Sequence, residues 1–298
     1  MSRRRGLLMV TAGSLLLGLL GVLVRDSSMP ASLMLVLRMS LAGVIVAAFF
    51  GRRRVVDEAR RPGIAPLLLL MGVVDAGSLL CTFLAIRYTN VAVAMFLSFM
   101  APAYVAVIAP RVFRQPTERV AIVALGMALG GMAVMLAPAL RDGGLAAGLT
   151  VGGVAAGLAA GLLLGIYFVI AKALRQRVSS PTVVLAECWL TTAFVLPLAL
   201  WQGLAGGYSL RADDFVRVLL LAIVCTAVPY MLIVTSLGFV PVQQASILSY
   251  LEPVSAPVYA LVLLGEAPAA WTVAGGILIL AGGVLVVLAG SAETAAPP

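Results

Sequence analysis

The chain has 298 residues and a formal net charge of +8, and 62% of its residues are apolar while 11% are charged. Its mean hydropathy of +1.13 excludes an ordinary soluble globular domain and indicates an integral membrane protein. Histidine is absent and the three cysteines stand singly in apolar runs, so we expect no zinc or other metal site, disulfide framework or cofactor.

Apolar runs of about 19 residues or more, near the length that crosses ~30 Å of hydrocarbon, follow one another along the chain. The opening SRRRGLLMVTAG has the basic start of a signal peptide, but no small-residue cleavage site follows before Arg25, so we expect a retained first helix. We predict ten transmembrane helices, at 6–24, 31–50, 64–86, 90–110, 119–137, 148–172, 181–202, 214–236, 241–264 and 271–290.

The basic residues lie in short clusters between these spans, a pattern that favours a topological role over nucleic-acid binding. With the amino terminus inside, fourteen basic residues face the cytoplasm and five face outward, while Arg38 lies within the second span. The positive-inside rule therefore predicts cytoplasmic termini, and we expect a multi-pass protein of the cell inner (plasma) membrane.

Spans 2 and 3 carry charged residues inside the membrane. Such a charge costs about 2.5–3.5 kcal/mol at the bilayer centre and should face the bundle interior or a watery cavity. Asp75, Ser78 and Thr82 recur at i, i+3 and i+7 on one face of span 3, which favours a pocket lining. We expect Arg38 in span 2 to be structural, bonded to loose carbonyls or to Asp75.

An internal repeat appears when the chain is shifted by 151 residues. Residues 90–136 then match 241–287 at nine positions, which pairs span 4 with span 9 and span 5 with span 10. This divides the chain into five-helix halves, residues 1–141 and 142–298. Because five is odd, the halves cross the membrane in opposite senses, as in many secondary transporters. The predicted fold is an all-α membrane protein of two inverted repeats.

Spans 6 and 7 combine a packing motif with further polar groups. Four glycines at steps of four in span 6 predict close approach of a neighbouring helix; they are Gly153, Gly157, Gly161 and Gly165. Tyr167 follows them, and with Tyr230 and Phe99 it is a candidate aromatic wall of a pocket. Glu187 lies near the cytoplasmic end of span 7, and we expect it to be structural.

The stretch ILSYLEPVSAPVYALVLLGE, residues 247–266, lies mostly in span 9 and carries a carboxylate at Glu252, about 16 Å from the start of the span at 241 and therefore near the midplane, like Asp75. Pro253 and Pro257 cannot donate to the carbonyls four residues back, which predicts a kink and a wet spot beside Glu252. The alternative is a structural carboxylate held by backbone amides or by Arg38. Glu266 precedes a proline and is predicted to cap helix 10.

The segment PVQQASILSYLEPVSAPVYALVLLGEAPAAWTVAGGILILAGGVLVVL resembles the closing helices of EamA-type carriers of the drug/metabolite transporter superfamily, with a proline in helix 9, Gly-Glu at its outer end and a glycine-rich helix 10. Arg38 in LVLRMSLAGVIV resembles an arginine that such carriers often place in helix 2. The first half departs from the pattern, with RQPTE at 114–118 in place of Gly-Glu. The resemblance implies an exporter of small metabolites, typically amino acids or related amphipathic compounds, whose central cavity is lined mostly by helices 1, 3, 4, 6, 8 and 9.

We therefore predict a secondary transporter that exports such compounds by alternating access, and not an enzyme. A flippase of lipid-linked substrates or a channel-like facilitator is the alternative. Without histidine, any proton coupling must use a carboxylate, and Asp75 and Glu252 are the candidates. The alternative to proton-coupled export is export without coupling to an ion. The expected partners are a small-molecule substrate and the lipid bilayer, with no nucleic acid. The candidate substrate-binding residues are Asp75, Ser78, Thr82, Met95, Phe99, Tyr167, Tyr230, Ser249 and Glu252.

Overall fold

The protein is helical throughout its described length. The structure, a computed structural model, describes residues 3–24, 27, 29–89, 91–114, 118–142, 150–205, 208 and 212–293, and these residues contain no strand. Ten segments are long and apolar enough to cross a membrane: Arg3–Val24, Ala31–Phe50, Ile64–Tyr88, Val93–Phe113, Arg119–Pro138, Val151–Arg175, Ser180–Gly203, Asp213–Ser236, Val242–Leu264 and Ala270–Leu288. They confirm the predicted ten-helix membrane fold.

Some spans are single helices and others are interrupted. The single helices are α3 (Ala31–Phe50), α5 (Ile64–Tyr88), α8 (Arg119–Asp142), α9 (Val151–Arg175), α10 (Ser180–Ala205) and α15 (Ala270–Glu293). Span 1 consists of α1 (Arg3–Leu17) and α2 (Leu19–Val24), span 4 of α6 (Val91–Ser98) and α7 (Ala101–Phe113), and span 9 of α13 (Val242–Leu248) and α14 (Leu251–Leu264). Span 8 joins α11 (Ala212–Ala222) to α12 (Val228–Ser236) through a π-helical turn, Ile223–Ala227, and the short α4 (Arg52–Ala59) follows span 2.

The interruptions of spans 4 and 9 fall at matching places of the repeat. Helix α6 ends at Ser98, and α13 ends at Leu248, one residue before the position that matches Ser98. A proline follows each break within the first turn of the next helix, Pro102 in α7 and Pro253 in α14. Proline has no N–H to donate, so a break beside a proline leaves one backbone donor fewer without a partner than a break beside another residue would. The kink that the sequence predicts near Glu252 is therefore confirmed.

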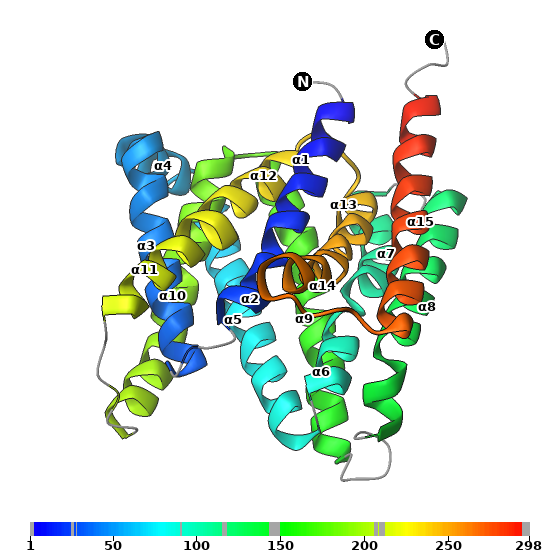
Figure 1. The fold of residues 1–298 in the computed structure, drawn as a ribbon. Coiled ribbons are helices and arrows are strands. Elements are labelled where there is room, and N and C mark those ends of the chain that lie inside the picture. The colour runs from blue at the N-terminus through cyan, green and yellow to red at the C-terminus, as the bar shows by residue number, and fades with distance from the viewer. Residues whose placement is uncertain are drawn as a thin grey trace.

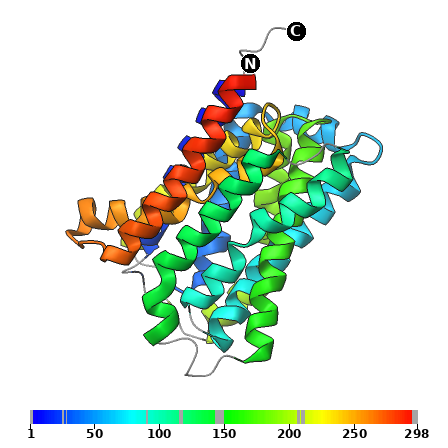
Figure 2. The same ribbon diagram turned by 90° about the vertical axis from the view of Figure 1, so that its right-hand side faces the viewer.

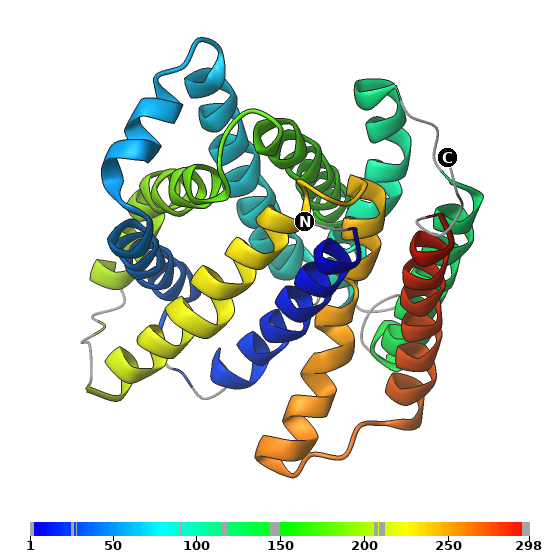
Figure 3. The ribbon, with the colours of Figure 1, turned by 90° about the horizontal axis from the view of Figure 1, so that it is seen from above.

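The helices of the two halves interlock. Helices α6 and α7 pack on α9, and α14 packs on α1 and α2, so spans 4 and 9 each contact the first span of the other half. Seen from above, α1 lies between α12 and α14, while α15 lies beside α8 (Figure 3). Both described ends of the chain lie at the same end of the bundle (Figures 1 and 2).

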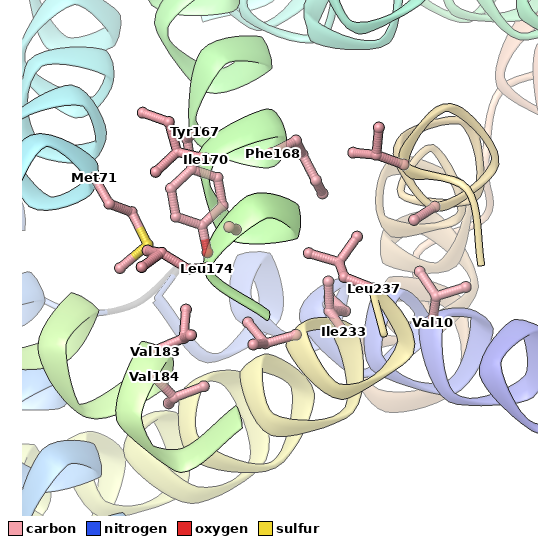
Figure 4. Packing of buried hydrophobic residues seen from close by; sticks show 14 of the residues in the cluster. Val10, Met71, Tyr167, Phe168, Ile170, Leu174, Val183, Val184, Ile233 and Leu237 are labelled. Carbon is pink, nitrogen blue, oxygen red and sulfur yellow. The ribbon is translucent and has the colours of Figure 1, made fainter. Parts of the chain in front are cut away.

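The largest apolar core joins the two halves toward this terminus end. Side chains of α1, α9 and α12 meet there, among them Val10, Leu174 and Leu237, each no more than 2% exposed (Figure 4). Lys172 near the end of α9 donates from Nζ to the carbonyls of Leu237 (2.5 Å) and Val240 (2.9 Å) in the turn between spans 8 and 9. The chain is therefore closely packed at this end of the bundle.

Candidate functional site

A cavity of about 390 Å³ lies in the middle of the bundle. Its lining comes from ten helices, α1, α2, α3, α5, α6, α7, α9, α10, α12 and α14, and from the break in the middle of span 9. The four charged residues identified within the spans, Arg38, Asp75, Glu187 and Glu252, all line it. This placement follows the expectation that a charge in hydrocarbon faces a cavity or the bundle interior.

Eight of the nine candidate substrate-binding residues line this central cavity: Asp75, Thr82, Met95, Phe99, Tyr167, Tyr230, Ser249 and Glu252. Ser78 does not. Its side chain is buried, and Oγ donates a hydrogen bond to the carbonyl of Ala160 on α9, at 2.9 Å. The stripe on span 3 therefore divides, with Ser78 bridging two helices while Asp75 and Thr82 face the cavity.

Arg38 does not have the partners that the sequence predicts for it. Among the described residues no hydrogen bond or ion pair joins Arg38 to Asp75 or to a loose carbonyl, and its Nη1 is buried without a hydrogen-bond partner. The Asp75 carboxylate instead accepts a hydrogen bond from Oγ1 of Thr191, at 2.7 Å. The expected hydrogen bonds of Arg38 are therefore not seen among the described residues, although Arg38 and Asp75 interact electrostatically.

Glu187 lies in the cavity, although its position along span 7 suggested a place near the membrane surface. It is seven residues from the start of α10, a depth of about 10 Å, and the cavity reaches that depth. Its Oε2 is buried with no hydrogen-bond partner among the described residues. Thr191, one turn further along α10, is a site residue that sequence reasoning missed. The i, i+4 spacing of Glu187 and Thr191 was the available signal.

The charges of the cavity act on one another but do not balance. Asp75, Glu187 and Arg38 interact electrostatically, and the hydroxyl of Tyr167 approaches Glu187. Three carboxylates face one guanidinium, so the cavity is acidic when all are ionised. Among the described residues no group of three or more Cys, Asp or Glu side chains is arranged to hold a metal ion.

Glu252 has a fixed backbone, and its carboxylate interacts electrostatically with Arg38 but has no hydrogen-bond partner among the described residues. Its N–H donates to the carbonyl of Ser249 (3.0 Å), and Ser255 Oγ lies within hydrogen-bond distance of the carbonyls of Glu252 (3.0 Å) and Leu15 (3.1 Å). Among the described residues neither a backbone amide nor Arg38 donates to the carboxylate, as a purely structural role would require. The side chain is therefore held at its base and open at its tip.

Tyr230 reaches the cavity from an irregular stretch of span 8. The π-helical turn Ile223–Ala227 precedes it, and Pro229 has no N–H to continue an α-helical ladder there. Oγ1 of Thr226 donates to the carbonyl of Leu221 at 3.0 Å, which satisfies a backbone group in the same stretch. Such single π turns are frequent at functional sites.

The prediction for Glu266 is wrong. Helix α15 begins at Ala270, so Glu266 lies four residues too early to cap it. Gly265 has a φ of 71° and ends α14, and the N–H of Glu266 donates to the carbonyl of Ala260 at 3.2 Å. Glu266 therefore belongs to the turn that closes α14. The Gly-Glu pair sets the end of span 9 because glycine adopts this left-handed conformation without strain.

The cavity extends away from the terminus end of the bundle. Val24, Ala31 and Ile86 line it near the opposite end of their spans. Toward the termini it is closed by the core of Figure 4, where Phe168 and Ile233 stand between the cavity and the packed side chains of Leu174 and Leu237. One end of the passage is thus lined by cavity residues while the other is sealed.

Polar contacts add to this seal at the surface. Glu118 accepts a hydrogen bond from Nε2 of Gln244 at 3.0 Å and lies 3.6 Å from Arg3, which joins the first turns of spans 1, 5 and 9. Glu58 on α4 accepts from Oγ of Ser179 (2.7 Å) and from Oγ1 of Thr182 (2.6 Å) at the start of α10. These contacts hold the starts of the spans, and α4, together at the terminus end.

Comparison with known proteins gives three kinds of match. The model of the EamA-like transporter family matches residues 4–137 and 151–288, one segment in each half. Two proteins of Archaeoglobus fulgidus, each described as an uncharacterized transporter, are similar. One is 29% identical over 66% of this chain and 67% of its own length, the other 26% identical over 40% and 42%. A crystal structure of a further protein shares the fold, with a TM-score of 0.81 and 19% identity over 97% of this chain and 98% of its own.

Proposed function

The chain belongs to the EamA-like transporter family, and we propose that it is a secondary transporter that exports small amphipathic metabolites, amino acids or related compounds, by alternating access. The observation that carries the proposal is the central cavity, in which one guanidinium and three carboxylates face a largely apolar space. Such a site suits a molecule with charged groups at one end and an apolar body.

An amino acid or related amine would find a partner for each of its groups. Carboxylates bind an ammonium group, and Arg38 has a buried nitrogen without a partner that can donate to a substrate carboxylate. Phe99, Tyr167 and Tyr230 offer ring surface to the apolar part. These contacts are strengthened where the surrounding protein lowers the effective dielectric constant below that of water.

The side on which the cavity extends defines the conformation of the protein. If both termini are cytoplasmic, as the arginine clusters predict, the conformation described here faces outward. Release to the outside would then require no further opening. Return to an inward-facing state would require the side chains of α1, α9 and α12 to separate at the terminus end, together with the bonds of Lys172 and Glu118.

Transport by purified protein in liposomes tests the proposal. We expect movement of one or more members of a panel of amino acids and organic amines, measured with and without a pH gradient. Stimulation by the gradient would support coupling through Asp75, Glu187 or Glu252, and equal rates would support uncoupled export. Scrambling of labelled lipid with no movement of any small molecule would instead support the flippase reading and contradict the proposal.

The substitution Glu252→Gln tests the site. It keeps the shape of the side chain and removes the charge, so we expect transport to fall roughly 10- to 100-fold, the value of a hydrogen bond to a charged group, about 1.5–3 kcal/mol. Asp57→Asn, at an exposed position of α4, is the matched control and should leave transport unchanged. Folded yield by size-exclusion chromatography should be equal in both variants. Unchanged transport by Glu252→Gln would assign this carboxylate to structure.

A further inference from the structure

A second cavity, of about 460 Å³, adjoins the central one. It lies between α2, α6, α8 and α14, and we call it the tail cavity. Five residues line both cavities: Leu17, Leu20, Met95, Phe99 and Glu252. The two spaces are therefore neighbours across one shared wall, and Glu252 is the charged residue in that wall.

The tail cavity differs from the central one in its chemistry. Its only charged lining residues among the described part of the chain are Glu252 at one end and Glu266 at the other. Between them the lining is aliphatic, with Met132 and Met135 of α8 opposite Ala256 and Ala260 of α14. From Glu252 to the end of α14 at Leu264 the cavity wall is about 18 Å long. This space is longer than an amino acid needs and has little to offer a polar group.

Small residues account for this space. Gly21 on α2 and two alanines one turn apart on α14 leave room that larger side chains would fill. Pro257 in the middle of α14 removes one backbone donor and leaves a further gap in the helical ladder. Helix α14 packs on α1, α2 and α15, while α6 and α8 form the opposite wall of the cavity.

Resting on the proposed function, we propose that the tail cavity binds the hydrocarbon tail of amphipathic amines whose ammonium group is held by Glu252. The carboxylate tip has no hydrogen-bond partner among the described residues and lies where the two cavities meet. An ammonium bound there places one part of the molecule among the charges of the central cavity and the other along α14. The excess of carboxylates over Arg38 favours a cation over a zwitterion with a long tail. Methionine side chains adapt to tails of differing shape.

A series of alkylamines tests the proposal. Binding of butylamine, hexylamine and octylamine to the full chain in lipid nanodiscs is measured against the free amine concentration, with the uptake by protein-free nanodiscs subtracted. Each added methylene that enters the tail cavity should increase affinity about fourfold, the ratio that corresponds to ~0.8 kcal/mol. Affinity that does not change from butylamine to octylamine would overturn the proposal.

Two substitutions on the same helix locate the tail. Ala260→Phe fills the tail cavity, so octylamine should lose its advantage while butylamine binds as before. Val262→Phe is the matched control, because Val262 is 73% exposed on another face of α14 and lines neither cavity. Ala260→Leu, a milder filling, replaces Ala260→Phe if that variant does not fold. An equal chain-length effect in the Ala260 and Val262 variants would place the tail elsewhere and overturn the proposal.

The uncharged alcohol 1-octanol separates a substrate tail from a general hydrocarbon site. If the ammonium is held by Glu252, octylamine should bind at least tenfold more tightly than octanol, and Glu252→Gln should remove most of this difference. Equal binding of octanol and octylamine would mean that the cavity holds a lipid chain and would overturn the proposal. Failure of the proposed function is a different result: alkylamines would bind as described, yet no amine or amino acid would cross the liposome membrane.

Discussion

Two crossing helix pairs join the halves of the protein, and the repeat relates them to each other. In the first pair span 4 packs on span 6, and in the second span 9 packs on span 1. The first pair is close. A methyl group added at Gly161 of α9 would lie 2.5 Å from the carbonyl oxygen of Leu97, and one added at Gly157 would lie 2.7 Å from the Leu97 side chain. The second pair is interrupted in both helices, at Gly18 and at Ser249–Tyr250, and two cavities lie beside it.

The comparison indicates that duplication preserved the backbone while the side chains diverged. Both copies of the broken span have a proline just after the break, but Glu252 of span 9 corresponds to Ala101 of span 4. Ala101 is 1% exposed, and its carbonyl oxygen is 3.1 Å from where a methyl group at Gly165 would lie. We infer that the first pair is the more rigid one and that the second, which has Glu252 at its break, is the more adaptable, although side chains of both pairs line the central cavity.

Gly161→Ala should have the largest effect on the first pair. The added methyl group meets two backbone carbonyls, at 2.5 Å from Leu97 O and 3.2 Å from Ser98 O, and these cannot move aside as a side chain could. Overpacking of this kind costs about 1–3 kcal/mol, which we expect to appear as a lower thermal unfolding temperature in detergent. Gly126→Ala, in the middle of α8 with no atom within 4 Å of the added group, is the control. It should unfold at the same temperature or slightly higher. Equal stability of the two variants would contradict a rigid first pair.

Gly18→Ala should affect transport more than stability. Its methyl group would overlap Oγ of Ser255 and would lie 2.9 Å from the carbonyl oxygen of Glu252 and 3.0 Å from the amide nitrogen of Ala256, so the Ser255 side chain and α14 must shift. The adjoining cavities can absorb the shift, but Glu252 moves with the helix. We expect transport in liposomes to fall roughly tenfold, which corresponds to about 1.4 kcal/mol, while stability changes by less than in Gly161→Ala.

Gly126→Ala, with no atom within 4 Å of the added group and a position that lines neither cavity, is also the control for Gly18→Ala. Its transport should equal that of the unmodified protein. If Gly18→Ala instead lost stability as strongly as Gly161→Ala and transported normally, the second pair would be as rigid as the first, and the distinction between them would fail.

The sequence predicted the spans well because hydropathy depends only on neighbouring residues, whereas the site required knowledge of packing. A charge inside a span must avoid lipid, so hydropathy and charge alone place Arg38, Asp75 and Glu252 in the interior of the bundle. Glu187 was misjudged because its depth was counted from the end of its own span, whereas the cavity reaches further toward the termini than the midplane.

Other features had no readable signal in a single sequence. The hydrogen bond of Thr191 to Asp75 depends on the rotation of α10 relative to α5, which neither helix determines alone. The tail cavity depends on how far α14 lies from α8, and that distance follows from the contacts of α14 with α1 and α2. The start of α15 at Ala270 depends on the path of the chain after Gly265. The glutamate and proline that follow this glycine were not enough to predict where the helix begins.

Ser78→Ala should have the smallest effect and separates support from binding within one helix. Its Oγ donates to Ala160 of α9, so the loss should cost about 0.6 kcal/mol, the mean for a hydrogen bond between membrane helices, and leave transport unchanged.

One turn away, Thr82 lines the central cavity, and its Oγ1 lies 3.2 Å from Oγ of Ser98 at the break in span 4. Thr82→Val keeps the shape and should lower transport with a similarly small loss of stability. Both are measured by thermal unfolding and by liposome transport. Slower transport in Ser78→Ala than in Thr82→Val would reverse the assignment, because the hydroxyl that contacts α9 would then matter more to the substrate than the one that faces the cavity.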